Sequence, residues 1–305
     1  MKRKLKTLWA VVRASFIAWA DDNAAQLSAA IAFYTIFSIP PLLFIAMTIV
    51  GHIYNTETAK IQLVAQVSNF VGTQSGEFVR SLLENPQRQF DGPLASIISI
   101  IVLIGGASAI FYQIQYALNK IWKVPKKQDL SLFKTVKNRF LSFLLTLGIG
   151  FLFMIVIILS IFLSEFLDKA KGIIQNIFLL DLLNFVVLFI TVTILIAIIY
   201  RIIPDKEISW TDIWLGASVT GLLFMVGKFG ISYYLNISNT GFAYGAAGSL
   251  IVLLIWVYFS TIIFLLGAEF THVYSKRFGS RKNPPLLTKY GIEKVPDQNG
   301  TTREK

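Results

Sequence analysis

The chain has no cysteine and only two histidines among its 305 residues. The absence of cysteine excludes disulfides, thiol catalysis and cysteine-ligated metal sites. The two histidines, His52 and His272, end the first and the last long apolar runs, which the topology derived below places at opposite membrane faces, so we expect that they do not share a metal ion. No HExxH, phosphate-loop, GxSxG or paired-carboxylate motif is present. These absences predict a protein that is not an enzyme and that holds neither a metal nor another cofactor.

Charged residues are also scarce, at 15% of the chain, whereas 55% is hydrophobic and the mean hydropathy is +0.64. A helix needs roughly 20 apolar residues to span the hydrocarbon core of a bilayer. The runs are solidly apolar, without the alternation of barrel strands. We therefore predict an all-α, polytopic membrane protein with six transmembrane helices, at about Leu27–Val50, Leu94–Ala117, Phe140–Ser164, Leu182–Ile203, Ile213–Leu235 and Ala246–His272.

The net charge of +11 is distributed unevenly along the chain. Residues 1–13 carry five basic groups, the segment 118–139 carries seven against one acidic group, and the tail from Ser275 carries eight against three. The segment 51–93 instead has four acidic and three basic residues. Positively charged loops stay in the cytoplasm. Both termini are therefore predicted to be cytoplasmic, and the basic surface is expected to meet anionic lipid headgroups rather than nucleic acid.

Three regions follow from this pattern. Residues 1–26 are predicted to form an amphipathic helix that lies in the membrane interface. Residues 27–274 form the six-helix domain, in which the outer loop 51–93 contains short amphipathic helices, and residues 275–305 form a basic, flexible cytoplasmic tail. The stripe that predicts the interfacial helix consists of Leu5, Trp9, Val12, Phe16 and Trp19.

The first span contains two adjacent prolines, Pro40 and Pro41. Proline lacks a backbone N–H and kinks a helix, and the carbonyls that it frees need other partners inside a membrane. The pair therefore predicts a helix break that lies inside the bundle or beside a cavity. A kink without a functional role remains the alternative.

Two ionisable residues fall inside predicted spans, where each costs a few kcal/mol or more. Lys228 lies roughly 6 Å beyond the middle of the fifth span and Glu269 roughly 16 Å beyond the middle of the sixth, at about 1.5 Å per residue. The two spans run in opposite directions, so we do not expect an ion pair between them. Lys228 either reaches the outer headgroups or faces a cavity, where it meets an anionic substrate or Asp181.

Polar residues gather near Glu269 at the predicted cytoplasmic ends of the spans. If these ends converge, their side chains form a polar vestibule for substrate binding or translocation. The alternative is ordinary helix capping and interfacial ion pairing. The other members of this candidate set are Asp21, Asp22, Gln26, Gln115 and Asn119.

At these same positions the chain resembles the YihY/BrkB family of bacterial inner-membrane proteins. The resemblance covers about residues 10–280 and implies six helices in the bacterial cytoplasmic membrane. Family members have been labelled virulence or serum-resistance factors and ribonuclease BN, and one branch is associated with lipid export. The ribonuclease label fits this sequence poorly, because no metal or acid–base constellation is present. The resemblance rests on Asp21–Tyr34, Pro40-Pro41, Ala117–Trp122, Trp256–Tyr258 and Gly267–Phe270.

Our leading hypothesis is a transporter or flippase-like exporter of an amphipathic, anionic lipid or metabolite. A non-transporting membrane scaffold or envelope-integrity factor is the alternative. No ATP-binding motif is present, so a transporter would draw on a gradient or a partner. Small residues spaced four apart, at which helices approach closely, predict a compact bundle and are compatible with a homo-oligomer. Gly267 and Thr271 are one such pair.

Overall fold

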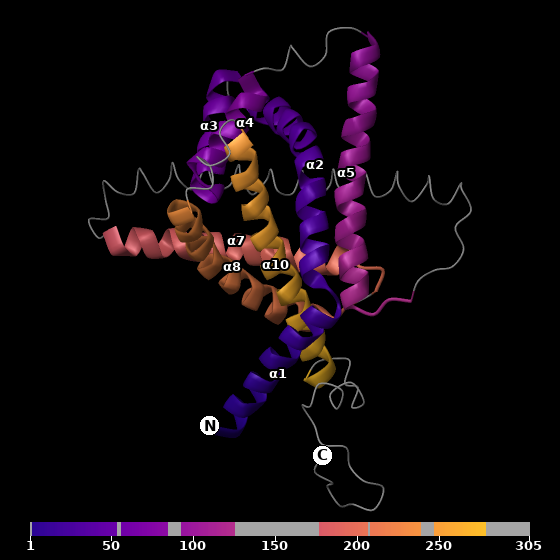
Figure 1. Cartoon of the computed structure of the whole chain (residues 1–305). Helices are drawn as coiled ribbons and strands as arrows, with labels where there is room; N and C mark the ends of the chain where they lie inside the picture. The colour runs from indigo at the N-terminus through magenta and orange to yellow at the C-terminus, as the bar shows by residue number, and fades with distance from the viewer. Residues whose placement is uncertain are drawn as a thin grey trace, which may run out of the picture.

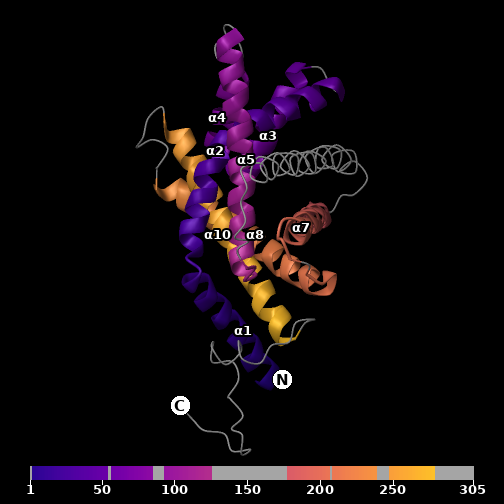
Figure 2. The same cartoon turned by 90° about the vertical axis from the view of Figure 1, so that its right-hand side faces the viewer.

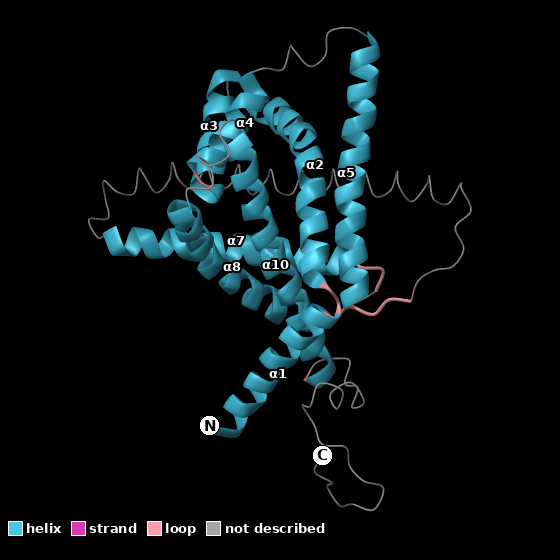
Figure 3. Cartoon of the chain, in the orientation of Figure 1, coloured by secondary structure: helices cyan, strands magenta, loops and turns pink. Residues whose placement is uncertain are grey.

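A computed structural model describes residues 2–53, 56–84, 93–125, 177–206, 208–238 and 247–278. Within these ranges the chain forms helices and loops and no strand, so the all-α prediction holds for the described part (Figure 3). The helices are α1 (Lys2–Asp21), α2 (Ala24–Ile53), α3 (Thr56–Val71), α4 (Thr73–Glu84), α5 (Pro93–Ile121), α7 (Ile177–Ile202), α8 (Trp210–Ser238) and α10 (Gly248–Arg277).

Five of the six predicted spans coincide with helices, namely α2, α5, α7, α8 and α10. The sixth, Phe140–Ser164, lies outside the described residues, as does most of the predicted tail. Three described helices are long and apolar enough to cross a membrane, over Phe185–Ile202, Trp210–Leu235 and Gly248–Arg277. Membrane-crossing length and composition are therefore established for three helices, and the count of six spans remains a prediction.

Helix α10 is the centre of the bundle, and it packs against α8, α2, α1, α4 and α5. Helices α2 and α5 lie side by side in Figures 1 and 2, and α7 packs against α8. Helix α7 runs steeply across the direction of α2 and α5 and is seen end-on in Figure 2. We call the end of the bundle where α1 lies, and where α5, α7 and α10 end, the α1 end.

Helices α8 and α10 cross in close contact through glycines. Gly216 and Thr220 of α8 face Thr271 and Gly267 of α10, so each glycine accommodates a threonine of the other helix. Tyr200 of α7 joins this crossing: its hydroxyl donates a hydrogen bond of 2.6 Å to the carbonyl of Phe264. Close approach at the predicted small-residue pair, Gly267 and Thr271, is therefore present.

Helix α1 packs lengthwise on the end of α10. Its buried face consists of small or β-branched side chains, Val11, Ala14 and Ala18, which share a cluster with Phe270 and Val273 of α10. In the predicted interfacial stripe, Trp9 is 69% exposed and Phe16 is 54% exposed, whereas Val12 packs against this cluster and Trp19 packs against the main core. The contact of α1 with α10 is thus made mainly by small residues beside the stripe, while membrane contact through Trp9 and Phe16 remains a prediction.

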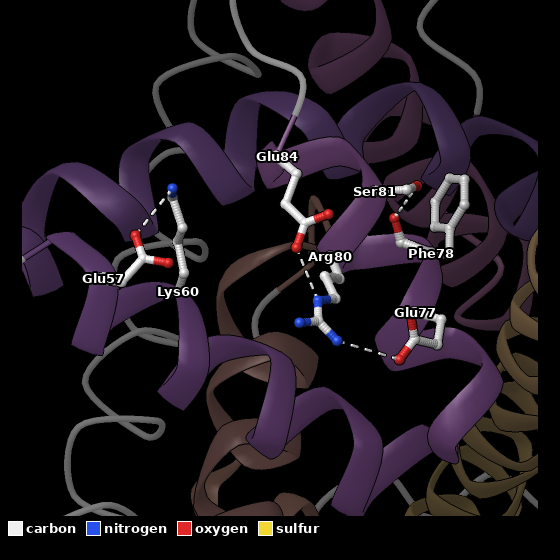
Figure 4. Close-up of polar contacts among 7 residues, drawn as sticks. All are labelled: Glu57, Lys60, Glu77, Phe78, Arg80, Ser81 and Glu84. Carbon is white, nitrogen blue, oxygen red and sulfur yellow. Dashed lines mark hydrogen bonds and ion pairs between the residues drawn. The ribbon is translucent and has the colours of Figure 1, made fainter.

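The segment 51–93 contains the two short helices that were predicted for it, α3 and α4, joined at Gly72, whose φ of +109° favours glycine. Helix α4 packs on α10 and α3 packs on α2, at the end of the bundle opposite α1. Figure 4 shows their exposed ion pairs, Lys60 with Glu57 at 3.2 Å and Arg80 with Glu84 at 2.8 Å. The hydrogen bond to Glu84 raises the pKa of Arg80 above its ordinary value.

Pro40 and Pro41 lie within α2, which continues through both to Ile53. The helix is therefore not interrupted at the prolines, since a proline removes only its own N–H and its neighbours keep the helical path. The outer part of α2 leans toward α3 and α4 in Figure 1.

Candidate functional site

Glu269 is the most unusual buried group in the described part of the chain. Its side chain is 0% exposed, in α10, next to the fully buried Ala268 and one turn from the fully buried Leu265. Neither carboxylate oxygen has a hydrogen bond of ordinary geometry to any described residue. A buried ionised carboxylate without hydrogen bonds costs several kcal/mol. Packing alone does not account for a glutamate in this position.

Asp22 lies beside Glu269, at the junction of α1 and α2. It is 5% exposed, and Lys123 Nζ lies 2.5 Å from its Oδ1 and 2.6 Å from its Oδ2. Lys120 donates to the backbone carbonyl of Asp22 at 2.5 Å. Two lysines from the end of α5 therefore hold the α1–α2 junction, one through the side chain of Asp22 and one through its backbone.

The backbone aims Lys123 at Asp22. Helix α5 ends with Lys123 N–H donating to the carbonyl of Lys120 at 3.1 Å and Val124 N–H donating to that of Asn119 at 2.9 Å. This is the Schellman pattern, in which the residue after the helix takes the left-handed conformation and is usually glycine. Here it is Lys123, with φ of 52°. A lysine in this conformation costs about 1 kcal/mol or more relative to glycine.

The junction between α1 and α2 also contains a residue in the left-handed conformation, Asn23. Asn23 has φ of 54° and donates its N–H to the carbonyl of Ala20 at 3.0 Å, while its own carbonyl accepts from Gln26 and Leu27 at the start of α2. Asparagine tolerates the left-handed region better than most residues. The two left-handed residues set the directions in which the carboxylate of Asp22 and the ammonium of Lys123 leave their helices.

The charged groups that act on the Glu269 carboxyl, among the described residues, are Asp22, Asp21 and Lys123. Asp22 and Lys123 are already paired at 2.5 Å, whereas Asp21 is exposed. We call Glu269, Asp22 and Lys123 the Glu269 cluster. Both carboxyl groups are buried and lie near one ammonium group, that of Lys123, whose side chain is 42% exposed and contacts Asp22.

An aromatic pair lies at the same end of the bundle. Trp122 is fully buried, and its ring meets that of His272 edge to face, with centroids 5.1 Å apart and planes at 83°. Trp122 directly precedes Lys123, and His272 follows Glu269 by one turn of α10. This ring contact joins the end of α5 to α10.

Gln115 and Asn119 do not meet Glu269, because they hold the loop between α7 and α8. Asn119 donates to Asp205 Oδ2 at 2.9 Å and accepts from the Asp205 N–H at 2.8 Å. Gln115 donates to Asp205 Oδ1 and to the Ile203 carbonyl, both at 3.3 Å. In the structure these two amides contact a loop rather than the other members of the predicted vestibule.

The remaining predicted residues are dispersed. Gln26 is exposed, and Lys228 is half-buried in α8. Since Thr220 faces Gly267, Glu269 lies at the level of residue 218, and Lys228 is ten residues further along α8, roughly 15 Å at 1.5 Å per residue. The candidate set predicted from the sequence includes Glu269 and Asp22 but not Lys123. The sequence analysis used Lys123 and its basic neighbours only to predict membrane orientation.

Two features at the α1 end concern ligands. An open cavity of about 300 Å³ is lined by Arg201, Pro204, Asp205 and Lys206. Two of these side chains are basic: Lys206 Nζ donates to the Trp122 carbonyl at 3.0 Å, and the Arg201 guanidinium donates to the Ile208 carbonyl and lies over the Trp210 ring. Across the ranges that the structure describes, no group of three or more histidine and carboxylate side chains could hold a metal ion.

Comparison with known proteins gives the family. The chain is 27% identical over 266 residues to a UPF0761 membrane protein of Coxiella burnetii, covering 83% of this chain and 88% of the relative. It is 27% identical over 247 residues to one of Pseudoalteromonas atlantica, covering 80% and 78%. A UPF0761 membrane protein of Legionella pneumophila is 26% identical over 262 residues, covering 84% of this chain and 59% of the relative.

The chain therefore spans about three fifths of the length of the Legionella relative. No solved structure matches it. The family described as virulence factor BrkB matches residues 16–289, nearly the whole chain. The resemblance found in the sequence is thus confirmed, and the chain is a membrane protein that belongs to the BrkB family.

Proposed function

We propose that this protein is a multi-pass protein of the bacterial inner membrane that transports an amphipathic, anionic lipid or metabolite. The observation that carries the proposal is Glu269, a fully buried carboxyl whose oxygens meet no donor among the described residues and which lies within hydrogen-bonding reach of the Asp22 carboxyl. Ionisable groups inside membrane helices are costly and typically belong to substrate or ion pathways. A scaffold gains nothing from such a group.

The anionic character of the substrate is supported by the cavity at the end of α7. Arg201 and Lys206 border it, and a guanidinium and an ammonium together suit a phosphate or carboxylate headgroup. The surface of α7 and α8 that continues from this end carries many exposed apolar side chains, among them Ile202, Trp210 and Trp214. A headgroup in the cavity would leave its acyl chains along an apolar surface.

Transport can be measured on purified protein in vesicles of phosphatidylethanolamine and phosphatidylglycerol, with a fluorescent headgroup-labelled phosphatidylglycerol and an impermeant quencher. We expect the wild type to move the labelled lipid between leaflets, and Glu269→Gln to slow this about tenfold. Glu84→Gln, at an exposed position on α4, is the matched control and should transport normally. Vesicles that move neither the lipid nor organic anions faster than protein-free vesicles would contradict the proposal.

A membrane scaffold is the second candidate, and the contacts of Gln115 and Asn119 favour it. Both amides are engaged with Asp205 and the α7–α8 loop, as expected of a rigid docking surface rather than of an open path. Crosslinking in intact cells distinguishes the two functions: a stable protein partner on this loop, together with transport-inactive vesicles, would favour the scaffold.

A further inference from the structure

We propose that Glu269 is a proton-binding site and that the proton is the ion coupled to transport. This inference rests on the proposed function and identifies the ion that acts at the same cluster.

The charges at the cluster do not balance when both carboxyls are ionised. Asp22 takes both of its close contacts from Lys123, at 2.5 and 2.6 Å. Glu269, fully buried, has no hydrogen-bond donor of ordinary geometry among the described residues. One ammonium therefore faces two carboxyl groups, and a second negative charge in this place would be uncompensated. A proton on Glu269 neutralises that charge.

The groups around Glu269 come from four elements. The α1–α2 junction contributes Asp21 and Asp22, and the end of α5 contributes Lys123. The ammonium of Lys120 is bound to the Asp22 carbonyl and does not figure among the groups that act on Glu269. Helix α8 brings the buried Asp212 to this end, and α10 itself brings His272 one turn away.

A proton suits this place better than a metal cation does. A hard cation takes six or more oxygen ligands, whereas a proton needs a single carboxylate oxygen. Within the described ranges no cluster of three histidine or carboxylate side chains is present. The site has one carboxyl group, Asp22, that is paired with Lys123, and a second, Glu269, that lies beside Asp22 without a cation of its own.

The proton also controls a contact between helices. While Glu269 is neutral, Lys123 forms an ion pair with Asp22 only, and this ion pair fixes the end of α5 to the α1–α2 junction. When Glu269 ionises, its carboxylate repels Asp22 and competes for the same ammonium. Proton release therefore loosens the contact that joins α5, α2 and α10 at the α1 end, which is the kind of change that a coupled transporter needs.

The test is labelling of purified protein with dicyclohexylcarbodiimide, which adds to a protonated carboxyl in an apolar site and forms an acylurea on it. Mass spectrometry locates the adduct, and the C=O stretch of a protonated carboxyl in the infrared difference between wild type and Glu269→Gln is a second measurement. We expect an adduct on Glu269 at neutral pH, at least fivefold less at alkaline pH, and no adduct on Asp22.

Two variants sharpen this result. Lys123→Gln removes the ammonium and should add Asp22 to the labelled positions, whereas Glu84→Gln on the exposed face of α4 should change nothing. Absence of both the adduct and the infrared band overturns the proposal. Protection of Glu269 by sodium ions, at a pH where labelling is otherwise complete, would overturn it in favour of a sodium site.

These measurements do not depend on transport, so the two proposals fail separately. If Glu269 forms the adduct but the protein moves no substrate, the proton site is supported and the proposed transport function is contradicted. Transport that proceeds without any dependence on a pH gradient, in a protein whose Glu269 gives neither adduct nor infrared band, removes the proton site and its coupling and leaves the transporter.

Discussion

Thr220 of α8 lies directly against Gly267 of α10. A Cβ atom added at Gly267 would come within 1.9 Å of Thr220 Oγ1, and one added at Gly216 would come within 1.8 Å of Thr271 Oγ1. Each threonine hydroxyl donates to the carbonyl of the glycine one turn earlier in its own helix, at 2.7 Å. The two helices thus meet through the same Gly-x-x-x-Thr unit, used twice in antiparallel directions, and the hydroxyls are satisfied without crossing the interface.

Gly267→Ala should therefore destabilise the protein. The added methyl group must push α8 and α10 apart, and overpacking of this kind costs about 1–3 kcal/mol. The measurement is thermal unfolding in a mild detergent. Gly230→Ala is the matched control in α8, because nothing lies within 4 Å of its added Cβ, and alanine should leave stability unchanged or raise it by up to about 1 kcal/mol. Equal effects at the two glycines would show that the crossing is looser than described.

Tyr200→Phe should weaken the contact of α7 with the α8–α10 crossing. The Tyr200 hydroxyl is fully buried, donates to the Phe264 carbonyl at 2.6 Å and lies 3.3 Å from Thr220 Oγ1. Its removal should cost about 1 kcal/mol, the net value of a buried hydrogen bond. Tyr233→Phe, at a position that is 70% exposed on α8, should cost nothing measurable in the same unfolding experiment.

The sequence predicted most helix positions well, since a solidly apolar run spans a membrane as a helix, whereas the strands of a barrel alternate in polarity. The predicted span Ile213–Leu235 falls inside α8, and Ala246–His272 overlaps nearly all of α10. The sequence did not predict which faces of the helices pack against one another. In α1 the large side chains attract notice, yet the contact with α10 is made by Ala14 and its small neighbours, because close packing of two helices favours small residues.

The candidate site was predicted in part for a similar reason. Glu269 and Asp22 stand out because a carboxylate in or beside an apolar run is expensive. Lys123 does not stand out, since it is one of seven basic residues in a segment whose charge also reports topology. Its left-handed backbone, which aims its ammonium at Asp22, leaves no trace in the sequence because the position holds lysine rather than glycine. The partners of Gln115 and Asn119 were missed because Asp205 lies more than 80 residues away in the chain.

Asn119→Ala should free the loop between α7 and α8. It removes a hydrogen bond to the charged Asp205 Oδ2 and another from the Asp205 backbone N–H, and each exposed bond is worth about 1 kcal/mol or less. Amide hydrogen exchange of residues 203–206 should accelerate several-fold. Gln26→Ala, at an exposed position on α2, should leave exchange in this loop unchanged.

The left-handed conformation of Lys123 can be separated from its ion pair. Both Lys123→Ala and Lys123→Gly lose the ammonium, but only Lys123→Gly also relieves the strain that a Cβ causes in the left-handed region. We expect Lys123→Ala to be less stable than Lys123→Gly by about 1 kcal/mol, the cost of the left-handed region for an alanine. Asn23→Ala and Asn23→Gly, with φ of 54°, should repeat the same order in thermal unfolding. Equal stabilities within each pair would mean that these backbones relax.

Ala14→Leu should separate α1 from α10. Ala14 is fully buried in the cluster with Phe270 and Val273, and a leucine has no room there, so we expect a loss of about 1–3 kcal/mol. Because the chain has no native cysteine, a Val273→Cys variant has a unique thiol, and its maleimide labelling reports directly on this contact.

We expect Ala14→Leu to accelerate that labelling severalfold. Ala20 is exposed on the same helix, so Ala20→Leu should leave the labelling rate unchanged, because the new side chain points to solvent rather than into the contact with α10. An interfacial helix held to the membrane only through Trp9 and Phe16 would behave differently: the two leucine variants would then label alike, because α10 would not depend on α1 for cover.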